Sequence, residues 1–197
     1  MEALLYQGGC TERMGSVAAG TTVSDYKPEE IKRHSSVCTA TGSIQLDGLK
    51  VNLLDTPGMF DFAGGMIQGI SAADCVMITV SGKSGVRVGT KKAYRAAAGK
   101  PRMFVVTKLD DENANFYNVL TDLKSTFGPS VCPVVVPVIV DRKVDSYINL
   151  IEMKAYRYDA DGKAQEIPMP TSEVSEKLSY RVDGLIQAFS EAIAETD

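Results

Sequence analysis

The sequence predicts an α/β domain with a mostly parallel sheet and helices on both faces, followed by a small α+β subdomain. Apolar strand candidates alternate with helix candidates as far as about residue 128, which is typical of parallel α/β sheets. After this point strand candidates follow one another. The chain has 197 residues, 44% of them apolar, so it is long enough for one domain or one and a half. We therefore expect one unit over residues 1–128 and another over residues 129–197.

The N-terminal part predicts a helix, a loop and a hairpin. Residues 2–14 indicate a helix that begins upstream of the printed sequence, because no capping residue precedes it. Residues 15–39 are rich in glycine, threonine, serine and charge, which favours a long mobile loop. Residues 41–47 and 49–54 alternate between apolar and polar, and the Asp47-Gly48 pair between them predicts a hairpin turn.

The middle of the chain predicts three helices and two buried strands. The first helix is short, and Asp110 or Asp111 begins the third one as its capping residue. The expected helices span residues 64–73, 88–98 and 111–127, and the expected strands span residues 74–80 and 102–106.

The C-terminal part predicts strands and one last helix. Pro133 and Pro137 make residues 131–140 an edge strand, because proline cannot donate to a strand ladder. Residues 147–158 form a long strand candidate, and Asp161-Gly162 turns it back into residues 165–169. Thr171-Ser172 caps a helix whose apolar face is formed by Leu178, Val182, Leu185, Ile186, Phe189 and Ile193.

Composition excludes several functional classes. A formal net charge of −4 argues against a general electrostatic nucleic-acid binder. The four cysteines include no C-x-x-C pair, and there is a single histidine, so a zinc site is not expected. No apolar run is long enough to span a membrane, and we expect no membrane partner. Free cysteines without a secretory signal indicate the cytoplasm.

The strand candidate at residues 51–54 ends in a D-x-x-G turn, Asp55-Thr56-Pro57-Gly58. In nucleotide hydrolases such an aspartate acts on Mg²⁺ through water, and the glycine N–H contacts the γ-phosphate. An ordinary turn after a strand is the alternative. The following Asp61-Phe62 pair favours the nucleotide interpretation.

A second strand-end motif is Thr107-Lys108-Leu109-Asp110. An aspartate carboxylate can accept both N1–H and the 2-amino group of guanine, which adenine does not offer, while the lysine stem stacks over the base. A helix-capping aspartate is the alternative, and the first motif argues against it. Together the two motifs predict a GTP-binding domain.

The element that should cradle the phosphates is not found. The 197 residues contain no G-x-x-x-x-G-K-[ST] sequence. Gly82-Lys83-Ser84 looks similar to its end, but Met77 stands where the first glycine is required, so we interpret it as a decoy. A hydroxyl in residues 32–36 could complete a Mg²⁺ shell, although a solvated loop is the simpler interpretation. His34 is expected to be a surface residue.

Several motifs along the chain can be compared with known families. They are Thr11–Gly15, Asp25–Glu30, Asp55–Gly58 with Asp61-Phe62, Ser81–Val86, Lys108–Asn113 and Ile151–Tyr156. Together they resemble bacterial elongation factor G and its paralogues, a family of translational GTPases. The resemblance implies an α/β P-loop GTPase domain interrupted by an α+β insert. It also implies GTP hydrolysis on the ribosome, against large-subunit rRNA, for translocation or ribosome recycling.

The resemblance also implies roles for single residues. Ser36 takes the place of the loop hydroxyl that binds Mg²⁺, together with Asp55, and Gly58 takes the γ-phosphate role. Lys108 and Asp110 take the guanine roles, with Thr107 in place of the usual asparagine. GTP or GDP and Mg²⁺ are then the cofactors of the intact protein.

The departures from the family change the expectation for this chain. Met59 stands at the position of the histidine that orients the attacking water, so no catalytic residue is assigned. The first strand and the phosphate loop are expected upstream of Met1, and a final guanine-contacting loop beyond Asp197. We therefore expect the chain itself to be inactive and to bind no nucleotide tightly. A tetracycline-resistance-type ribosome protection GTPase, or a truncated ribosome-binding module without enzymatic activity, are the alternatives.

Without that first strand, the sheet should have unpaired edges. We expect the strands that end at Asp55 and begin at Asp74 to close on each other, or to pair with another molecule in a non-native self-association. Residues 15–39 should be disordered or displaced. The hairpin over residues 148–158 and the helix over residues 171–194 should be native-like, because their partners are local.

Overall fold

The computed structural model describes residues 1–141, 143–159, 162–170 and the single positions 184, 187, 190, 191 and 194. The chain divides into two compact units. Unit 1 contains Met1–Ile78 and Val88–Met103, and unit 2 contains Thr79–Arg87 and Phe104–Asp197. The expected boundary after residue 128 is not tested by this division and stays a prediction.

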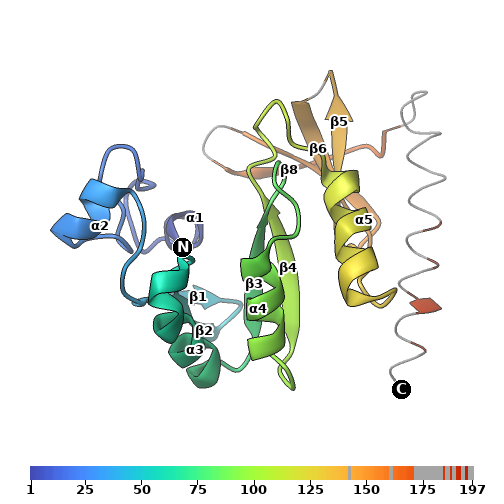
Figure 1. Ribbon diagram of the computed structural model, residues 1–197. Helices are drawn as coiled ribbons and strands as arrows, with labels where there is room; N and C mark the ends of the chain where they lie inside the picture. Colours follow the sequence, from blue (N-terminus) through green and yellow to red (C-terminus); the bar gives the residue numbers. More distant parts are fainter. Residues whose placement is uncertain are drawn as a thin grey trace. The chain divides into compact units, whose positions relative to one another are not determined.

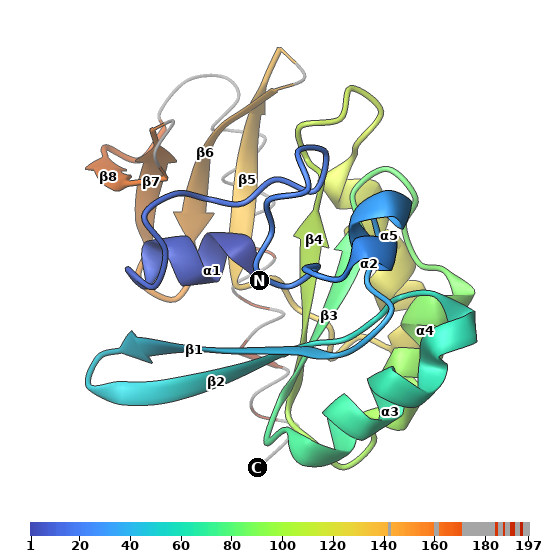
Figure 2. The same ribbon diagram turned by 90° about the vertical axis from the view of Figure 1, so that its left-hand side faces the viewer.

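Figures 1 and 2 show the helices and strands from two sides. They are, in chain order, α1 (Glu2–Gln7), α2 (Pro28–Arg33), β1 (Ala40–Leu46), β2 (Leu49–Asp55), the 3₁₀ helix η1 (Phe60–Phe62), α3 (Ala63–Ala72), β3 (Val76–Ser81), α4 (Val88–Ala96), β4 (Arg102–Thr107), α5 (Phe116–Phe127), β5 (Val135–Val140), β6 (Lys143–Asn149), β7 (Lys154–Tyr158) and β8 (Ala164–Ile167).

The predicted hairpin is confirmed. β1 and β2 pair antiparallel without a bulge, from Ala40 opposite Asp55 to Leu46 opposite Leu49. Asp47 and Gly48 both have positive φ angles, 48° and 79°, as the tight turns that suit twisted strands require. The turn therefore fixes the register that places Asp55 at the end of the hairpin.

The N-terminal helix is shorter than predicted. α1 ends at Gln7, and Gly9 adopts a left-handed φ of 68°. The N–H of Cys10 then donates to the carbonyl of Leu5 at 2.9 Å, which closes the helix end. A Cβ on Gly8 would lie 2.8 Å from the Ile44 side chain, so the helix ends directly against β1.

The expected loop over residues 15–39 is not a loop throughout, because this segment contains α2. Pro28 occupies the first turn, where its missing N–H costs nothing, and Glu30 reaches back to the N–H of Lys27 at 3.2 Å. The same carboxylate accepts the N–H groups of Val37 and Cys38, both at 3.0 Å. Glu30 is only 1% exposed, so one buried side chain organises the whole turn after α2.

A second carboxylate fixes the start of the same segment. Glu2 of α1 accepts the N–H groups of Val23 and Ser24 at 3.0 and 3.1 Å. A Cβ on Gly15 would clash with the Glu2 carboxylate, so the chain passes close to α1 at this point.

β3 and β4 form a two-stranded sheet connected by α4. The N–H of Val76 donates to Pro101 at one end, and the N–H of Gly82 donates to Thr107 at the other, so the two strands run parallel. Of the strand predicted as buried, Ile78 and Val80 are buried and Met77 is 54% exposed.

The predicted closure of β2 onto β3 is wrong, because these strands belong to different sheets. The connection between them is held by Lys100, which lies just before β4. Its ammonium donates to the carbonyls of Ile70, Ser71 and Ala73 at 2.7, 2.8 and 2.5 Å, at the C-terminal end of α3. Pairing with another molecule stays a prediction.

Unit 2 contains a four-stranded antiparallel sheet in the order β5-β6-β7-β8. β5, which contains Pro137, lies at the edge as predicted. The single long strand over residues 147–158 is wrong, since β6 ends at Asn149 and β7 begins at Lys154. The Asn149 side chain accepts the N–H groups of Ile151 and Glu152 at 3.0 and 3.3 Å, which turns the chain.

One face of this sheet packs against α5. The buried core there consists of Phe116, Leu120, Val136, Val138, Ile148, Leu150 and Ala155. α5 begins five residues later than predicted, because Asn115 rather than Asp110 or Asp111 caps it and accepts the N–H of Asn118 at 3.1 Å.

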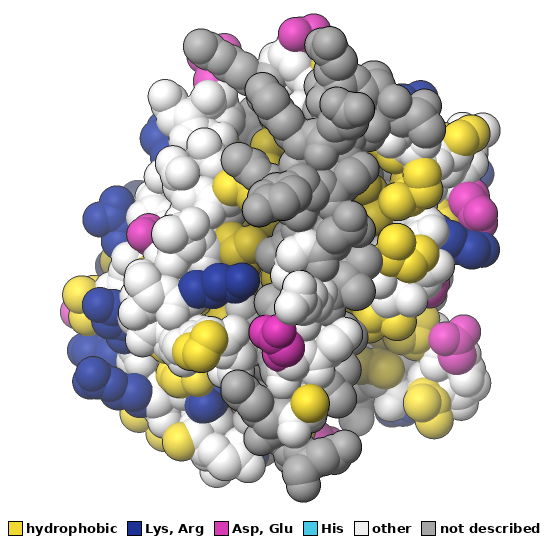
Figure 3. Space-filling view, turned by 90° about the vertical axis from the view of Figure 1, so that its right-hand side faces the viewer, with side chains coloured by type: hydrophobic (Ala, Val, Ile, Leu, Met, Phe, Trp, Pro, Cys, Tyr) yellow, Lys and Arg dark blue, Asp and Glu magenta, His cyan; other side chains and the backbone are white. Residues whose placement is uncertain are grey.

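The expected cap at Thr171-Ser172 and most of the last helix lie outside the described residues. The described positions 184, 187, 190, 191 and 194 are helical. Figure 3 shows that hydrophobic, basic and acidic side chains are all exposed on one face. Among the described residues, no helix combines the length and hydrophobicity needed to cross a membrane.

Candidate functional site

The D-x-x-G segment lies in unit 1, where β2 delivers Asp55 to the end of the hairpin. Pro57 is fully buried and packs against Gly65, where a Cβ would lie 3.3 Å from the proline ring. Gly58 is exposed, and a Cβ there would meet nothing within 4 Å. The turn is therefore anchored at Pro57 and leaves the backbone of Gly58 accessible to a ligand.

The Asp55 carboxyl is half-buried in acidic surroundings. Burial raises its pKa, and the nearby carboxylates of Asp25 and Glu2 raise it further, against the N-terminal ammonium and the Ser24 hydroxyl, which lower it. Asp25 is itself 7% exposed, and its Oδ1 has no hydrogen-bond partner. Such a site favours a cation, because positive charge would relieve the cost of the buried anions.

The segment after α2 contacts the end of the D-x-x-G turn through Ser35, the neighbour of Ser36, which was expected to bind Mg²⁺. The Ser35 hydroxyl donates to the Sδ of Met59 at 3.7 Å. Ser36 follows it and is half-buried in the stretch that leads to β1. The structure thus brings residues 35 and 59 together, while Ser36, Asp55 and Gly58 lie in the same unit.

The T-K-x-D motif lies in unit 2, at the end of β4. Lys108 adopts a left-handed φ of 57°, so the chain turns sharply there. Lys108 and Asp110 are exposed, whereas Thr107 and Leu109 are half-buried. All four line a pocket of about 560 Å³ that Lys143, Val144 and Tyr147 of β6 also line. The motif therefore presents its two charged side chains at an open cavity.

The T-K-x-D motif affects the pKa of Tyr147 through the charge of Asp110. Its pKa is raised, first by burial, then by Tyr158 and by the carboxylate of Asp110. Its ring packs edge-on against Tyr158, with centroids 5.7 Å apart. Sequence reasoning did not include β6 in the site, because only the folded sheet brings residue 147 to residue 110.

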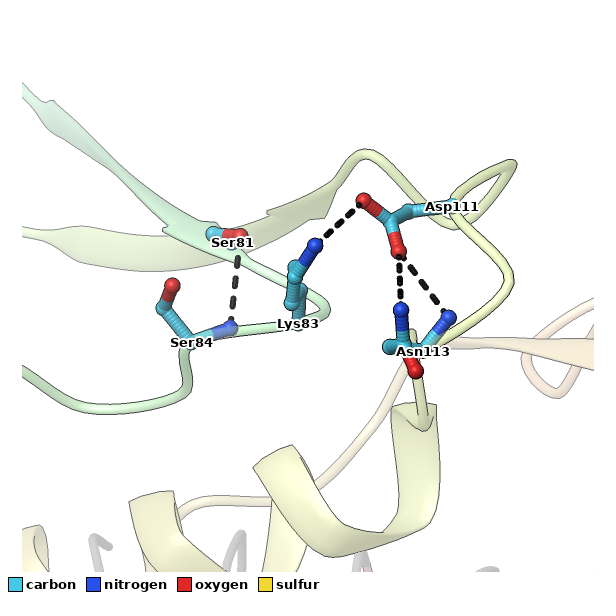
Figure 4. Close-up of polar contacts among 5 residues, drawn as sticks. All are labelled: Ser81, Lys83, Ser84, Asp111 and Asn113. Atoms are coloured by element: carbon cyan, nitrogen blue, oxygen red, sulfur yellow. Dashed lines mark hydrogen bonds and ion pairs between the residues drawn. The ribbon is translucent and has the colours of Figure 1, made fainter.

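The Gly82-Lys83-Ser84 sequence is not placed as a phosphate loop. In a phosphate loop the Lys-Ser pair opens a helix, but α4 begins only at Val88. The Lys83 ammonium instead pairs with the Asp111 carboxylate at 3.2 Å (Figure 4). This agrees with its interpretation as a decoy, and it shows a contact that the motif pattern did not reveal.

Comparison with known proteins identifies the family. A model of the elongation factor Tu GTP-binding domain matches residues 1–195. The chain belongs to the elongation factor Tu GTP-binding domain family. This match confirms the predicted α/β GTPase-type fold. The relatives described next confirm the resemblance to the elongation factor G branch.

Relatives within this family carry related names. An elongation factor G-like protein of Mycobacterium tuberculosis is 37% identical over 192 residues, covering 95% of this chain and 26% of the relative. One of Thermotoga maritima is 36% identical over 171 residues, covering 86% of this chain and 24% of the relative. Mitochondrial ribosome-releasing factor 2 of Anopheles gambiae is 29% identical over 194 residues, covering 96% and 26%.

A solved structure agrees with these relatives. A crystal structure from Thermus thermophilus is 40% identical, with a TM-score of 0.90 over 100% of this chain and 29% of that one. The chain thus spans about a quarter of the length of the proteins that it matches. The expected location of the first strand and phosphate loop, upstream of residue 1, stays a prediction.

Proposed function

We propose that this chain belongs to the GTP-binding domain of a ribosome-associated translation factor, which binds and hydrolyses GTP during translocation or ribosome recycling. The main support is that both nucleotide motifs lie at strand ends, Asp55 after β2 and Thr107 after β4, in a chain of the elongation factor Tu GTP-binding domain family. Strand ends are where open α/β sheets bind ligands. We place the parent protein in the cytoplasm, with the large-subunit rRNA of the ribosome as its partner.

The guanine base is assigned to unit 2. The exposed carboxylate of Asp110 can accept N1–H and the 2-amino group, the Lys108 stem can cover the base plane, and Thr107 shapes the start of the turn. The pocket beside them is open and large enough for a base. GTP and GDP are accordingly the nucleotides that we assign to the intact protein.

The Mg²⁺ ion is assigned to Asp55 and Ser36 of unit 1, and the γ-phosphate to the backbone N–H of Gly58. The half-buried Asp55 carboxyl, with its raised pKa and the partnerless Asp25 oxygen, fits a hard divalent cation. Bound there, Mg²⁺ would neutralise phosphate charge. Among the described residues no cluster of three metal-ligating side chains occurs. Magnesium needs no such cluster, because it usually takes one or two carboxylates plus phosphates and water.

GTP hydrolysis by the intact protein should be slow or altered, because Met59 stands at the position of the histidine that orients the attacking water. A thioether can neither accept nor donate a proton usefully, so it cannot orient an attacking water as an imidazole would. Met59 is 44% exposed, and its sulfur accepts the Ser35 hydroxyl. We assign no catalytic residue in this chain.

The substitution Asp110→Asn tests the assignment of the base. It is made in a version of the protein that is as long as its full-length relatives. The asparagine oxygen can still accept N1–H, but its NH₂ group would face the 2-amino group of guanine, whereas it can donate to the 2-oxo group of xanthine. We expect GDP affinity to fall roughly 10- to 100-fold, the effect of one hydrogen bond to a charged group, and xanthosine diphosphate affinity to rise. Nucleotide titration measures both, and Glu112→Gln, an exposed neighbour, is the control. Equal affinity of the unsubstituted protein for GDP and ADP would contradict the proposed function.

A further inference from the structure

The Ser81–Gly85 loop, here called the clasp loop, follows β3 and has no role in nucleotide binding so far. It is closed on itself, since the N–H of Gly85 donates to the Ser81 carbonyl at 2.9 Å and that of Ser84 to the Ser81 hydroxyl at 3.4 Å. Gly82 and Gly85 are buried, while Lys83 and Ser84 are exposed. The loop is thus a compact element with a buried base.

Gly82 contacts both ends of the turn that contains Asp110. Its N–H donates to the carbonyl of Thr107 at 2.7 Å, and its own carbonyl accepts the N–H of Asn115 at 3.0 Å. Thr107 begins the T-K-x-D motif and Asn115 caps α5. One residue of the clasp loop therefore holds the two points between which residues 108–114 turn.

Gly82 also packs so closely that even a methyl group would press on its neighbours. A Cβ there would lie 2.8 Å from Leu109 Cδ2, 3.1 Å from the Thr107 carbonyl oxygen and 3.2 Å from the Ala114 Cβ. The Thr107 oxygen is backbone and cannot rotate away. A larger residue at position 82 would therefore displace the turn that carries Asp110.

Lys83 makes a second contact, to the residue next to Asp110. Its Nζ lies 3.2 Å from Asp111 Oδ2, while Asp111 Oδ1 accepts the backbone N–H of Asn113 at 2.9 Å (Figure 4). The pKa of Asp111 is lowered, first by the Asn113 N–H and then by Lys83. The carboxylate of Asp111 thus connects the clasp loop to the turn.

The turn needs such support because of Lys108. A left-handed φ of 57° is unfavourable for a residue with a side chain, and it persists only where the surroundings enforce it. Asp110 itself is exposed. Its orientation depends on the backbone around it.

We propose that the clasp loop positions Asp110 for guanine, with Gly82 and Lys83 as positioning residues that touch no nucleotide. This inference rests on the proposed function and deepens it, because it assigns base selectivity to residues outside the base-binding motif. The ligand is a guanine nucleotide, and the selectivity at issue is recognition of its 2-amino group.

The substitution Gly82→Ala tests whether the clasp loop positions Asp110. It is made in a version of the protein that is as long as its full-length relatives. The readout is the ratio of affinities for GDP and inosine diphosphate, which lacks the 2-amino group. We expect the unsubstituted protein to prefer GDP roughly 10- to 100-fold, the effect of one hydrogen bond to a charged group. In Gly82→Ala, GDP affinity should fall at least about tenfold and the ratio at least about threefold. Loss of fold alone would lower both affinities together. Gly89→Ala is the matched control, because a Cβ there meets nothing within 4 Å.

A double-mutant cycle on Lys83→Met and Asp111→Asn gives an independent test. Their side chains are 53% and 33% exposed, so each substitution should lower GDP affinity only about two- to fivefold, and high salt should remove the difference. The double variant should be no weaker than either single one. Lys91→Met, on the exposed side of α4, should have no effect.

The two failures are distinguishable. A protein that does not prefer GDP to ADP overturns the proposed function before any variant is compared. A protein that prefers GDP, but in which Gly82→Ala keeps the GDP-to-inosine-diphosphate ratio, overturns the clasp-loop proposal alone. If Gly82→Ala does not fold, additive effects in the Lys83 and Asp111 cycle overturn it instead.

Discussion

Replacing the buried carboxylate of Glu30 by an amide should destabilise the turn after α2. Two backbone N–H groups, from Val37 and Cys38, donate to Oε1 at 3.0 Å, and that of Lys27 donates to Oε2 at 3.2 Å. In Glu30→Gln, Oε1 can still accept, but an NH₂ group replaces Oε2 and faces the N–H of Lys27. The side chain is 1% exposed, so water cannot replace the lost acceptor. One hydrogen bond to a charged group is worth about 1.5–3 kcal/mol, and we expect a loss of about 2–3 kcal/mol.

The loss should depend on pH in a defined direction. Burial by itself would raise the pKa of Glu30, but the N–H groups of Cys38, Val37 and Lys27 outweigh it and hold the pKa below its ordinary value of 4.5. A lowered pKa in the folded state contributes stability above the ordinary value, and that stability is lost as pH falls through the folded pKa. The difference between the unsubstituted chain and Glu30→Gln should therefore be full at pH 7 and shrink below about pH 4.5.

Urea and thermal unfolding of the 197-residue chain would measure this effect. For a chain of this size, about 2–4 °C of Tm corresponds to 1 kcal/mol, so Glu30→Gln should melt roughly 4–12 °C lower. Glu29→Gln removes the same charge from the same helix turn, but at an exposed position, and should cost at most about 1 kcal/mol. The prediction would be wrong if Glu29→Gln and Glu30→Gln lowered the free energy of unfolding equally. It would also be wrong if the loss caused by Glu30→Gln stayed constant down to about pH 3.

Three further predictions follow from the site and the fold. Met59→His, in a version of the protein that is as long as its full-length relatives, should raise the rate of ribosome-stimulated GTP hydrolysis. The increase should reach at most the roughly 10²- to 10⁴-fold that is typical of positioned proton-handling groups. An unchanged rate in a phosphate-release assay would mean that another residue orients the water. The 197-residue chain should bind GTP or GDP no more tightly than about millimolar, because it contains no G-x-x-x-x-G-K-[ST] sequence to cradle the phosphates; submicromolar affinity in a fluorescent-nucleotide titration would contradict this. Lys100→Met leaves the carbonyls at the end of α3 without their shared donor and should cost about 1–3 kcal/mol in urea unfolding, whereas the exposed Lys91→Met should be neutral.

Elements defined by local chemistry could be predicted from the sequence. The hairpin depends on Asp47-Gly48, and α3 and α4 were expected within two residues of their bounds, because glycine turns and apolar spacing are local signals. α2 was missed although Pro28 and Glu30 stand at the positions of a helix start, since six residues are too few to show periodicity. The start of α5 was misplaced because Asp111, an equally good cap, is engaged with Lys83 and Asn113.

The site shows the same division between local and long-range signals. Asp55, Lys108 and Asp110 are recognisable because each follows an apolar strand at a fixed spacing. Glu30, Gly82 and Tyr147 act through residues that the fold brings near from 7 to 37 positions away, as in the pairs Glu30–Val37, Gly82–Thr107 and Tyr147–Asp110. A single sequence contains no signal for such pairs.

The unbroken pairing of β1 with β2 has a consequence for how such domains can change in length. Side chains alternate between the two faces of a strand, so one residue inserted into β2 would turn Asp55 to the opposite face unless a bulge absorbed it. Two inserted residues would return Asp55 to its original face but would lengthen the β1–β2 hairpin. Insertions in natural or engineered versions of this domain should therefore concentrate at Asp47-Gly48, where Leu46 and Leu49 are already 56% and 70% exposed, and avoid the strand interiors.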